Sequence, residues 1–298
     1  MSEGRSHDDR STSPGPIDLC GIELADPLIN ASGTFDVLAA RRAFGDAAFE
    51  EFPFSAYVSK TITPLARPGN PPPRIWEEPA AMVNSIGLPN KGVEGFLAHD
   101  LPELAELPAP LIVSVMATSA EHFADAVRAI SGSDRVDGVE LNVSCPNVHS
   151  GLIVGEQPSE TEHLLETLRP ITDKPLIVKL TPNVADPSVI AVAAEQGGAD
   201  AVSLINTLKA APLMPDGSAW LGAGSGGLSG PAVRTVALKQ VADVVAAVDV
   251  PVIGMGGVEH GDHAAALIGA GATAVAVGTA NFRDPLAVER IRSELSNA

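Results

Sequence analysis

The chain contains little cysteine: Cys20 and Cys145 are the two thiols among 298 residues. Two thiols cannot build a disulfide framework, a four-cysteine iron–sulfur cluster or a cysteine-rich zinc site within this chain, and we predict no metal site. Basic residues are also few, because 19 Lys and Arg stand against 37 Asp and Glu and give a formal net charge of -18. Nucleic acid and anionic membranes both attract clustered cations, so we expect neither as a partner.

Long hydrophobic runs are missing as well. No run of eighteen uncharged apolar residues occurs, and residues 1–10 have no apolar segment of the kind found in signal peptides. We therefore expect a cytoplasmic protein. Residues 1–16 are polar and rich in Ser, Pro and Gly, which predicts a disordered tail followed by a single domain over residues 17–298.

The chain does contain short apolar runs that alternate with amphipathic stretches of helical length. This alternation is typical of repeated βα units. Eight runs are predicted as buried parallel strands: residues 27–31, 56–60, 111–116, 138–144, 176–180, 201–206, 251–255 and 274–277. Eight such strands in one chain of this length predict a closed (β/α)8 barrel, the TIM-barrel fold of the α/β class.

Helices and insertions complete the predicted barrel. Apolar residues at three and four spacing predict outer helices over residues 120–130, 160–168, 187–196, 231–248 and 260–269. Two connections are too long for plain turns: residues 61–90 after the second strand and residues 208–230 after the sixth. Insertions that follow barrel strands lie on the catalytic face.

Polar residues gather where the predicted strands end, which is where barrel enzymes place their active sites. Taken alone, a lysine there is explained by a surface position and a cysteine by an inert core position. Their occurrence together at one end favours a site instead. The residues are Lys60, Asn142, Ser144, Cys145, Lys179, Asn206 and Thr207.

The last two strands run into glycine-rich turns, at Gly254–Gly257 and Gly278–Ala280, each followed by a helix. Glycine lets backbone N–H groups approach a phosphate, and loops after the seventh and eighth strands of barrels commonly bind one. The alternative is a pair of tight turns that need glycine for positive φ. A third glycine run, Gly222–Gly227, fits the dinucleotide-binding pattern, but residues 213–220 before it do not read as a strand. We predict no nicotinamide cofactor on this chain.

Five motifs resemble those of the dihydroorotate dehydrogenase family and occur in the same order. The resemblance as a whole runs from about Ile17 to Phe282. The motifs are residues 84–90 (NSIGLPN), 142–147 (NVSCPN), 226–231 (GGLSGP), 253–257 (IGMGG) and 275–282 (VAVGTANF). The cysteine in NVSCPN, in place of serine, resembles class 1 enzymes, and the sequence around Gly230 is most similar to the class 1B catalytic subunit.

The resemblance implies the FMN-dependent oxidation of (S)-dihydroorotate to orotate in de novo pyrimidine (UMP) biosynthesis. Cys145 would remove a proton from the methylene carbon while hydride passes to the flavin. A thiol with an unperturbed pKa of about 8.5 suits that task if neighbouring groups favour the thiolate.

The resemblance also implies which residues touch each ligand. Lys60 would balance the orotate carboxylate, Lys179 would stabilise reduced flavin, and Ser114 stands where related enzymes usually have asparagine. The implied substrate contacts are Lys60, Asn84, Ser85, Ile86, Gly87, Leu88, Asn142, Asn147, Asn206 and Thr207. The implied FMN contacts are Ser32, Lys60, Thr61, Ser114, Asn142, Lys179, Ile205, Gly230, Gly256, Gly257, Gly278 and Thr279.

Several alternatives stay open. The resemblance implies a homodimer core, with a heterotetramer if a subunit carrying FAD and an iron–sulfur cluster passes electrons to NAD; fumarate or another oxidant is the alternative acceptor. A flavin-free lyase that uses Lys179 as a Schiff-base amine and an inert scaffolding subunit are the rival functions. Residues 146–155 are predicted to open for substrate and close to exclude water.

Overall fold

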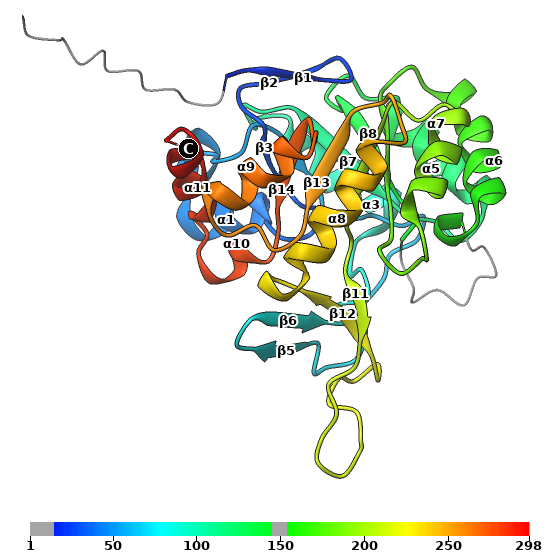
Figure 1. Ribbon diagram of the computed structural model, residues 1–298. Coiled ribbons are helices and arrows are strands. Elements are labelled where there is room, and N and C mark those ends of the chain that lie inside the picture. The colour runs from blue at the N-terminus through cyan, green and yellow to red at the C-terminus, as the bar shows by residue number, and fades with distance from the viewer. Residues whose placement is uncertain (1–14, 145–153, 298) are drawn as a thin grey trace, which may run out of the picture.

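Eight parallel strands form the centre of the computed structural model, which describes residues 15–144 and 154–297 (Figure 1). Their order in the sheet is β3-β14-β13-β10-β9-β8-β7-β4. The bounds are β3 (Leu28–Asn30), β4 (Tyr57–Val58), β7 (Leu111–Val115), β8 (Gly138–Asn142), β9 (Leu176–Lys179), β10 (Ala201–Leu204), β13 (Val252–Met255) and β14 (Ala274–Val277). Each strand lies inside a predicted run, and the predicted (β/α)8 barrel is confirmed.

The barrel closes between β3 and β4, the two ends of this strand order. One main-chain hydrogen bond crosses the gap, from Ser55 N to Leu28 O at 3.0 Å. The fully buried side chain of Asn30 supplies two more, because its Nδ2 donates to Val58 O and its Oδ1 accepts from Val58 N, both at 2.8 Å. A side-chain amide thus takes the place of a strand ladder.

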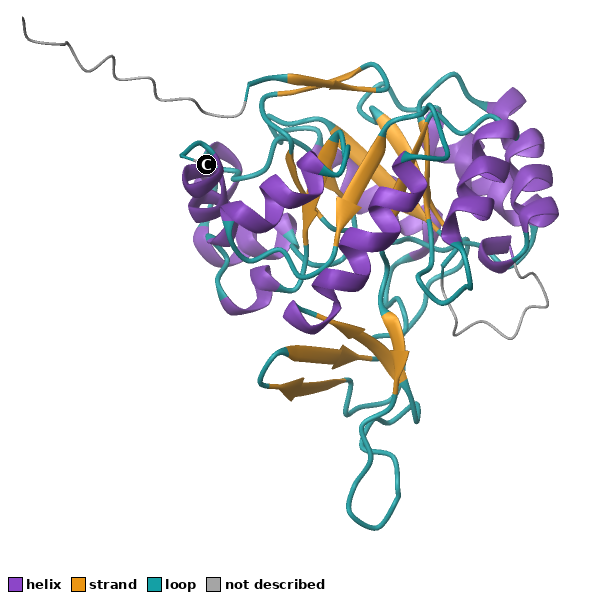
Figure 2. Cartoon of the chain, viewed as in Figure 1, coloured by secondary structure: helices purple, strands orange, loops and turns teal. Residues whose placement is uncertain are grey.

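Helices surround the strands (Figure 2). Capping residues set several of their starts: Ser119 Oγ accepts from His122 N at the start of α5, and Asp186 accepts from Ser188 N before Pro187 at the start of α7. The longer helices are α1 (Val37–Phe44), α5 (Ala120–Ser131), α6 (Pro158–Leu168), α7 (Pro187–Gln196), α8 (Arg234–Val245), α9 (Gly261–Gly269) and α11 (Ala287–Leu295).

The five predicted helices are all present. The one predicted over residues 231–248 begins as the 3-10 turn η4 (Pro231–Val233) and ends earlier, at Val245. The short helical segments are α2 (Ala47–Glu50), α3 (Gly92–Gly95), the π-helical η1 (Phe96–Asp100), α4 (Leu101–Leu104), η2 (Val154–Glu156), η3 (Arg169–Ile171) and α10 (Ala280–Arg283). No helix in the described ranges combines the length and the apolar character needed to cross a membrane.

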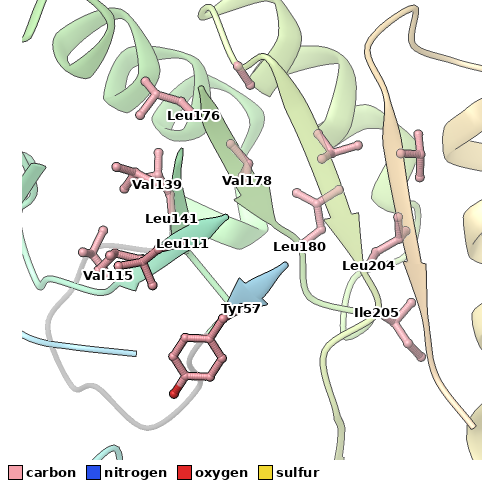
Figure 3. Packing of buried hydrophobic residues seen from close by; sticks show 14 of the residues in the cluster. Tyr57, Leu111, Val115, Val139, Leu141, Leu176, Val178, Leu180, Leu204 and Ile205 are labelled. Atoms are coloured by element: carbon pink, nitrogen blue, oxygen red, sulfur yellow. The ribbon is translucent and has the colours of Figure 1, made fainter. Parts of the chain in front are cut away.

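Alternate residues of each strand enter two different cores. Val139 and Leu141 of β8 pack with Leu111 and Leu176 in the large core between strands and helices (Figure 3). The residues between them face the barrel interior, whose apolar members form a second, smaller core. The hairpin β1 (Ile17–Leu19) and β2 (Ile22–Leu24) belongs to this second core and covers the amino-terminal end of the barrel (Figure 1).

The two predicted insertions pair with each other at the opposite end of the barrel. β5 (Ile75–Glu78) and β6 (Ala81–Asn84) come from the first insertion, and β11 (Leu208–Ala210) and β12 (Gly226–Ser229) come from the second. They form one four-stranded sheet in the order β11-β12-β6-β5, which projects from the barrel (Figure 1). Gly226 and Gly227 are therefore part of an antiparallel strand and do not form a turn between a strand and a helix.

Residues 1–14 and 145–153 lie outside the described residues. The predicted disordered tail and most of the predicted mobile loop fall there. Both stay predictions, as does the domain boundary at residue 17.

Candidate active site

A pocket of about 470 Å³ opens at the carboxyl ends of the barrel strands, beside the four-stranded sheet. Eighteen of the predicted site residues line it. They are Ser32, Lys60, Thr61, Asn84, Ser85, Ile86, Gly87, Leu88, Asn142, Lys179, Ile205, Asn206, Thr207, Gly230, Gly256, Gly257, Gly278 and Thr279. Residues from almost every strand end and from both insertions thus meet in one cavity, as active sites of barrels do.

Four predicted site residues are not among those lining residues. Ser144 is 6% exposed, and its hydroxyl contacts the amides of Asn142 and Asn206. Ser114 is fully buried, and its hydroxyl contacts Thr61 Oγ1 at 2.9 Å, so it lies behind the pocket wall. Cys145 and Asn147 lie outside the described residues. Their roles stay predictions.

Sequence reasoning missed part of the pocket wall. Thr34 follows β3, Met82 and Ser229 lie on the four-stranded sheet, and Phe282 follows β14. Thr34 and Phe282 follow barrel strands, so the rule that barrel sites lie at strand ends would have found them. Met82 and Ser229 give no comparable signal, because the sheet that brings them to the pocket joins segments almost 150 residues apart.

The loop from Asn84 to Leu88 is held in place by Asn70. Asn70 Nδ2 donates to Ser85 Oγ, and Asn70 N donates to Ile86 O, both at 3.0 Å. Gly87 has φ 78°, and a Cβ there would lie 2.4 Å from Asn70 Oδ1. Only glycine fits this turn, which presents the loop to the pocket.

Two lysines enter the pocket without a described partner of opposite charge. Lys179 ends β9 with 5% of its surface exposed, and Lys60 follows β4 and is partly buried. The lysine ion pairs among the described residues involve Lys91, Lys209 and Lys239 instead. A buried cation needs compensation, so these two positive charges favour an anionic ligand.

Amides and hydroxyls form a connected group on the same wall. Asn142 Nδ2 donates to Thr61 Oγ1 at 3.2 Å, and Asn142 Oδ1 accepts from Ser144 Oγ at 2.8 Å. Asn206 Nδ2 in turn donates to Ser144 Oγ, and Asn206 Oδ1 accepts from Thr207 N at 2.8 Å. Each amide is anchored through both its nitrogen and its oxygen, which leaves the second N–H of each Nδ2 for a ligand.

The glycine-rich turns approach one another closely. Gly257 has φ 70°, and a Cβ there would lie 2.8 Å from Arg234 Cβ and 2.9 Å from Gly230 O. The turn therefore excludes side chains at this point, as a backbone cradle for phosphate requires.

Next to this turn, Arg234 Nη1 lies 2.8 Å from His263 Nε2. Burial, and then the charge of Arg234, lower the pKa of His263.

These features fit the FMN that the sequence resemblance implies. The cavity volume lies within the range of cofactor sites. The turns at Gly257 and Gly278 suit a phosphate, and the uncompensated Lys179 suits a flavin ring that becomes negative on reduction.

Comparison with known proteins points in the same direction. The dihydroorotate dehydrogenase family profile matches residues 16–298. A relative from Pelobacter propionicus is 43% identical over 277 residues, covering 92% of this chain and 90% of the relative, and one from Anoxybacillus flavithermus is 40% identical over 281 residues, covering 94% and 89%. Both are named dihydroorotate dehydrogenase B (NAD(+)), catalytic subunit. A relative from Solibacter usitatus, 41% identical over 93% of this chain and 90% of its own length, is provisionally named dihydroorotate dehydrogenase A (fumarate). The chain belongs to the dihydroorotate dehydrogenase family.

Proposed function

We propose that this chain is the catalytic subunit of an NAD-linked dihydroorotate dehydrogenase, which oxidises (S)-dihydroorotate to orotate with FMN as its cofactor. The observation that carries the proposal is the single pocket in which two uncompensated lysines, a cluster of amides and two glycine-rich turns meet. The names of the relatives from Pelobacter propionicus and Anoxybacillus flavithermus support the same activity.

FMN would be held by the residues that follow several barrel strands. Gly230, Gly256, Gly257, Gly278 and Thr279 would surround its phosphate, and Ser32, Thr61, Asn142, Lys179 and Ile205 would contact the rest of the molecule. When bound, FMN supplies the acceptor for hydride. The buried Lys179 ammonium would favour the anionic reduced form through its charge.

Dihydroorotate is a polar ring that carries one carboxylate. Lys60 would pair with that carboxylate. Asn84, Asn142, Asn206 and Thr207 would satisfy the donors and acceptors of the ring and stabilise negative charge on its carbonyl oxygen while the proton leaves.

Cys145 would be the base. The thiolate takes a proton from the ring carbon next to the carbonyl, and the electron pair left on that carbon forms the new double bond as hydride departs from the neighbouring carbon. Cys145 lies outside the described residues, so its role rests on the NVSCPN motif. Ser144, just before it, is bonded to both Asn142 and Asn206, which fixes the chain at the point where Cys145 begins.

The electrons would leave through a partner subunit. The relatives' printed name, catalytic subunit, supports a second subunit, and NAD(+) in that name supports the final acceptor. We propose that the partner carries FAD and an iron–sulfur cluster and that two catalytic subunits form the core of a heterotetramer. Co-purification from the native cell tests this, because a lone chain that reduces fumarate would contradict it. The cytoplasmic location stays a prediction.

The activity is tested on purified wild-type protein and the Cys145→Ser variant. The protein should be yellow with bound FMN and should oxidise dihydroorotate with an artificial acceptor. A colourless protein would favour the lyase that uses Lys179, and a yellow but inactive one would favour the inert scaffold. Cys145→Ser should keep FMN and lose most turnover near neutral pH, because a hydroxyl is the poorer base. Undiminished turnover would remove Cys145 from the mechanism.

A further inference from the structure

A carboxylate lies inside the barrel without a role in the mechanism above. Glu140 is the middle residue of β8, and 3% of its surface is exposed. Its strand neighbours Val139 and Leu141 belong to the outer core, so Glu140 faces the interior, next to Ser114 of β7 in the strand register. No ion pair of Glu140 occurs within the described ranges, whose ion pairs involve other carboxylates. Buried carboxylates are rarely left without a cation.

Hydroxyl groups contact this carboxylate instead. Ser114 Oγ donates to Glu140 Oε1 at 2.9 Å, and Ser203 Oγ donates to Glu140 Oε2 at 3.4 Å. Ser114 Oγ also lies 2.9 Å from Thr61 Oγ1, which accepts from Asn142 Nδ2 at 3.2 Å. Ser114, Thr61 and Asn142 are 0%, 3% and 6% exposed, so water competes little for these contacts.

The carboxylate fixes the direction of every bond in this series. An ionised carboxylate accepts and never donates, and each hydroxyl has a single proton. The proton of Ser114 is therefore used on Glu140. Thr61 Oγ1 lies 2.9 Å from Ser114 Oγ and 3.2 Å from Ser32 Oγ, so we assign the Thr61 proton to the closer acceptor, Ser114. The Thr61 oxygen is then free to accept, which makes Asn142 Nδ2 its donor.

The same logic continues into the pocket. With its Nδ2 turned to Thr61, Asn142 presents Oδ1 to the Ser144 hydroxyl, which donates at 2.8 Å. Ser144 has then used its proton, so its oxygen accepts from Asn206 Nδ2. All donors point one way, from Asn206 through Ser144, Asn142, Thr61 and Ser114 to Glu140.

We propose that Glu140 is a positioning residue: it is the terminal acceptor of a one-way hydrogen-bond chain that sets the amide orientation of Asn142 and Asn206 toward the pocket. An amide turned by 180° exchanges its donor and acceptor, and the ligand then meets the wrong group. That the ligand is a pyrimidine with fixed donors and acceptors rests on the proposed function. Glu140 itself touches neither pocket nor ligand; it acts through Ser114 and Thr61.

Two serines that contact the same carboxylate make a matched pair for the test. Ser114 lies in the hydrogen-bond series that ends at Glu140, whereas Ser203 contacts the other carboxylate oxygen from β10 and makes no further side-chain hydrogen bond among the described residues. Both are fully buried. Ser114→Ala and Ser203→Ala therefore remove the same atoms from the same interior, and their packing costs are similar.

Orotate binding is measured by titrating the flavin absorption of each FMN-loaded protein, together with the KM for dihydroorotate. Ser114→Ala should weaken orotate binding and raise KM by about tenfold, the factor equivalent to about 1.4 kcal/mol and to one lost hydrogen bond. Ser203→Ala should stay within about twofold. Equal effects of the two variants, or unchanged binding in Ser114→Ala, would overturn the positioning role. A wild-type protein that does not bind orotate would instead contradict the proposed function.

The conservative replacement of Glu140 supplies a second test. Glu140→Gln keeps an oxygen that can accept from Ser114, so it should bind orotate within about threefold of wild type, whereas Glu140→Leu should match Ser114→Ala. Should Glu140→Leu fail to fold, the comparison of Glu140→Gln with Ser114→Ala remains. Orotate binding as weak in Glu140→Gln as in Ser114→Ala would contradict the role of acceptor.

Discussion

Replacing Gly257 with alanine tests the glycine-rich turn directly. The residue has φ 70°, a conformation that costs an L-residue about 1–2 kcal/mol. The new Cβ would also lie 2.8 Å from Arg234 Cβ and 2.9 Å from Gly230 O, and overpacking of this kind costs about 1–3 kcal/mol. We expect the free energy of unfolding to fall by about 2–5 kcal/mol in total.

Thermal unfolding measures this loss. At about 2.1 cal/mol/K per residue, a chain of 298 residues unfolds with an entropy of about 0.6 kcal/mol/K, so Tm should fall by about 3–8 °C. The purified Gly257→Ala variant should also contain less FMN, which absorbance at flavin wavelengths reports on the same sample.

Gly278→Ala is the matched control. Gly278 lines the same pocket, but its φ is not positive, and a Cβ there would meet Ala31 Cβ at 3.5 Å and Thr34 Cγ2 at 3.7 Å, which are ordinary contacts. Its Tm should stay within about 2 °C of wild type. If the two variants unfold at the same temperature, neither positive φ nor the close contact with Arg234 limits the turn.

Two further predictions concern titrating groups. Burial, followed by repulsion from Asp200 and Asp18, raises the pKa of Cys20 from 9.0 to about 12. In the Cys145→Ser variant, where Cys20 is the remaining thiol, a thiolate-directed reagent at pH 8 should react about a thousandfold more slowly with native than with urea-unfolded protein. Equal reaction rates of the native and unfolded protein would refute the raised pKa. The pKa of His263 is lowered by burial and by Arg234, so the unfolded state takes up the proton first as pH falls below about 6.5, and the stability that neutral His263 contributes above that pH is lost. Denaturant unfolding should therefore show a larger loss of stability between pH 7.5 and pH 5.5 in wild type than in His263→Gln, and parallel losses would contradict this sign.

The strands of the barrel could be predicted from the sequence because each lies in a short, mostly apolar run. The predicted ends run too far in several places. Lys60 and Asn206 belong to apolar runs in the sequence but leave the ladder and line the pocket. A run of residues marks burial, whereas a ladder depends on the neighbouring strand, which the sequence does not name.

The four-stranded sheet could not be predicted in the same way. Its strands are three or four residues long, and Gly226 and Gly227 in β12 are typical of turns rather than strands. They pair because β6, more than 140 residues earlier in the chain, provides the partner edge. Glu140 was hidden for a related reason: a single charge in an apolar run gives no sign that its partners are the serines of two neighbouring strands.

The site residues divide similarly. Residues in motifs or at strand ends were found, because the barrel brings all strand ends to one face. The position of Ser114 behind the wall depends on which way its strand residue points and on the Thr61 hydroxyl that covers it. That information exists only once the barrel has closed.

The closure of the barrel between β3 and β4 is coupled to ligand binding. Proteins open locally where few bonds must break. The hydrogen bonds across this junction include one main-chain bond, the bonds of the Asn30 amide, the bond from Asp26 N to Ser55 Oγ at 3.1 Å and the bond from Ser32 Oγ to Ser59 O at 2.8 Å. Ser32 follows β3 on one side of the junction, and Lys60 and Thr61 follow β4 on the other side; all three line the pocket. A ligand that contacts residues on both sides of this junction stabilises the closed barrel, so its binding free energy is coupled to the free energy of closing β3 against β4. Few hydrogen bonds join β3 to β4, and hydrogen exchange at the amide of Val58, which donates to Asn30 Oδ1, reports when the two strands separate.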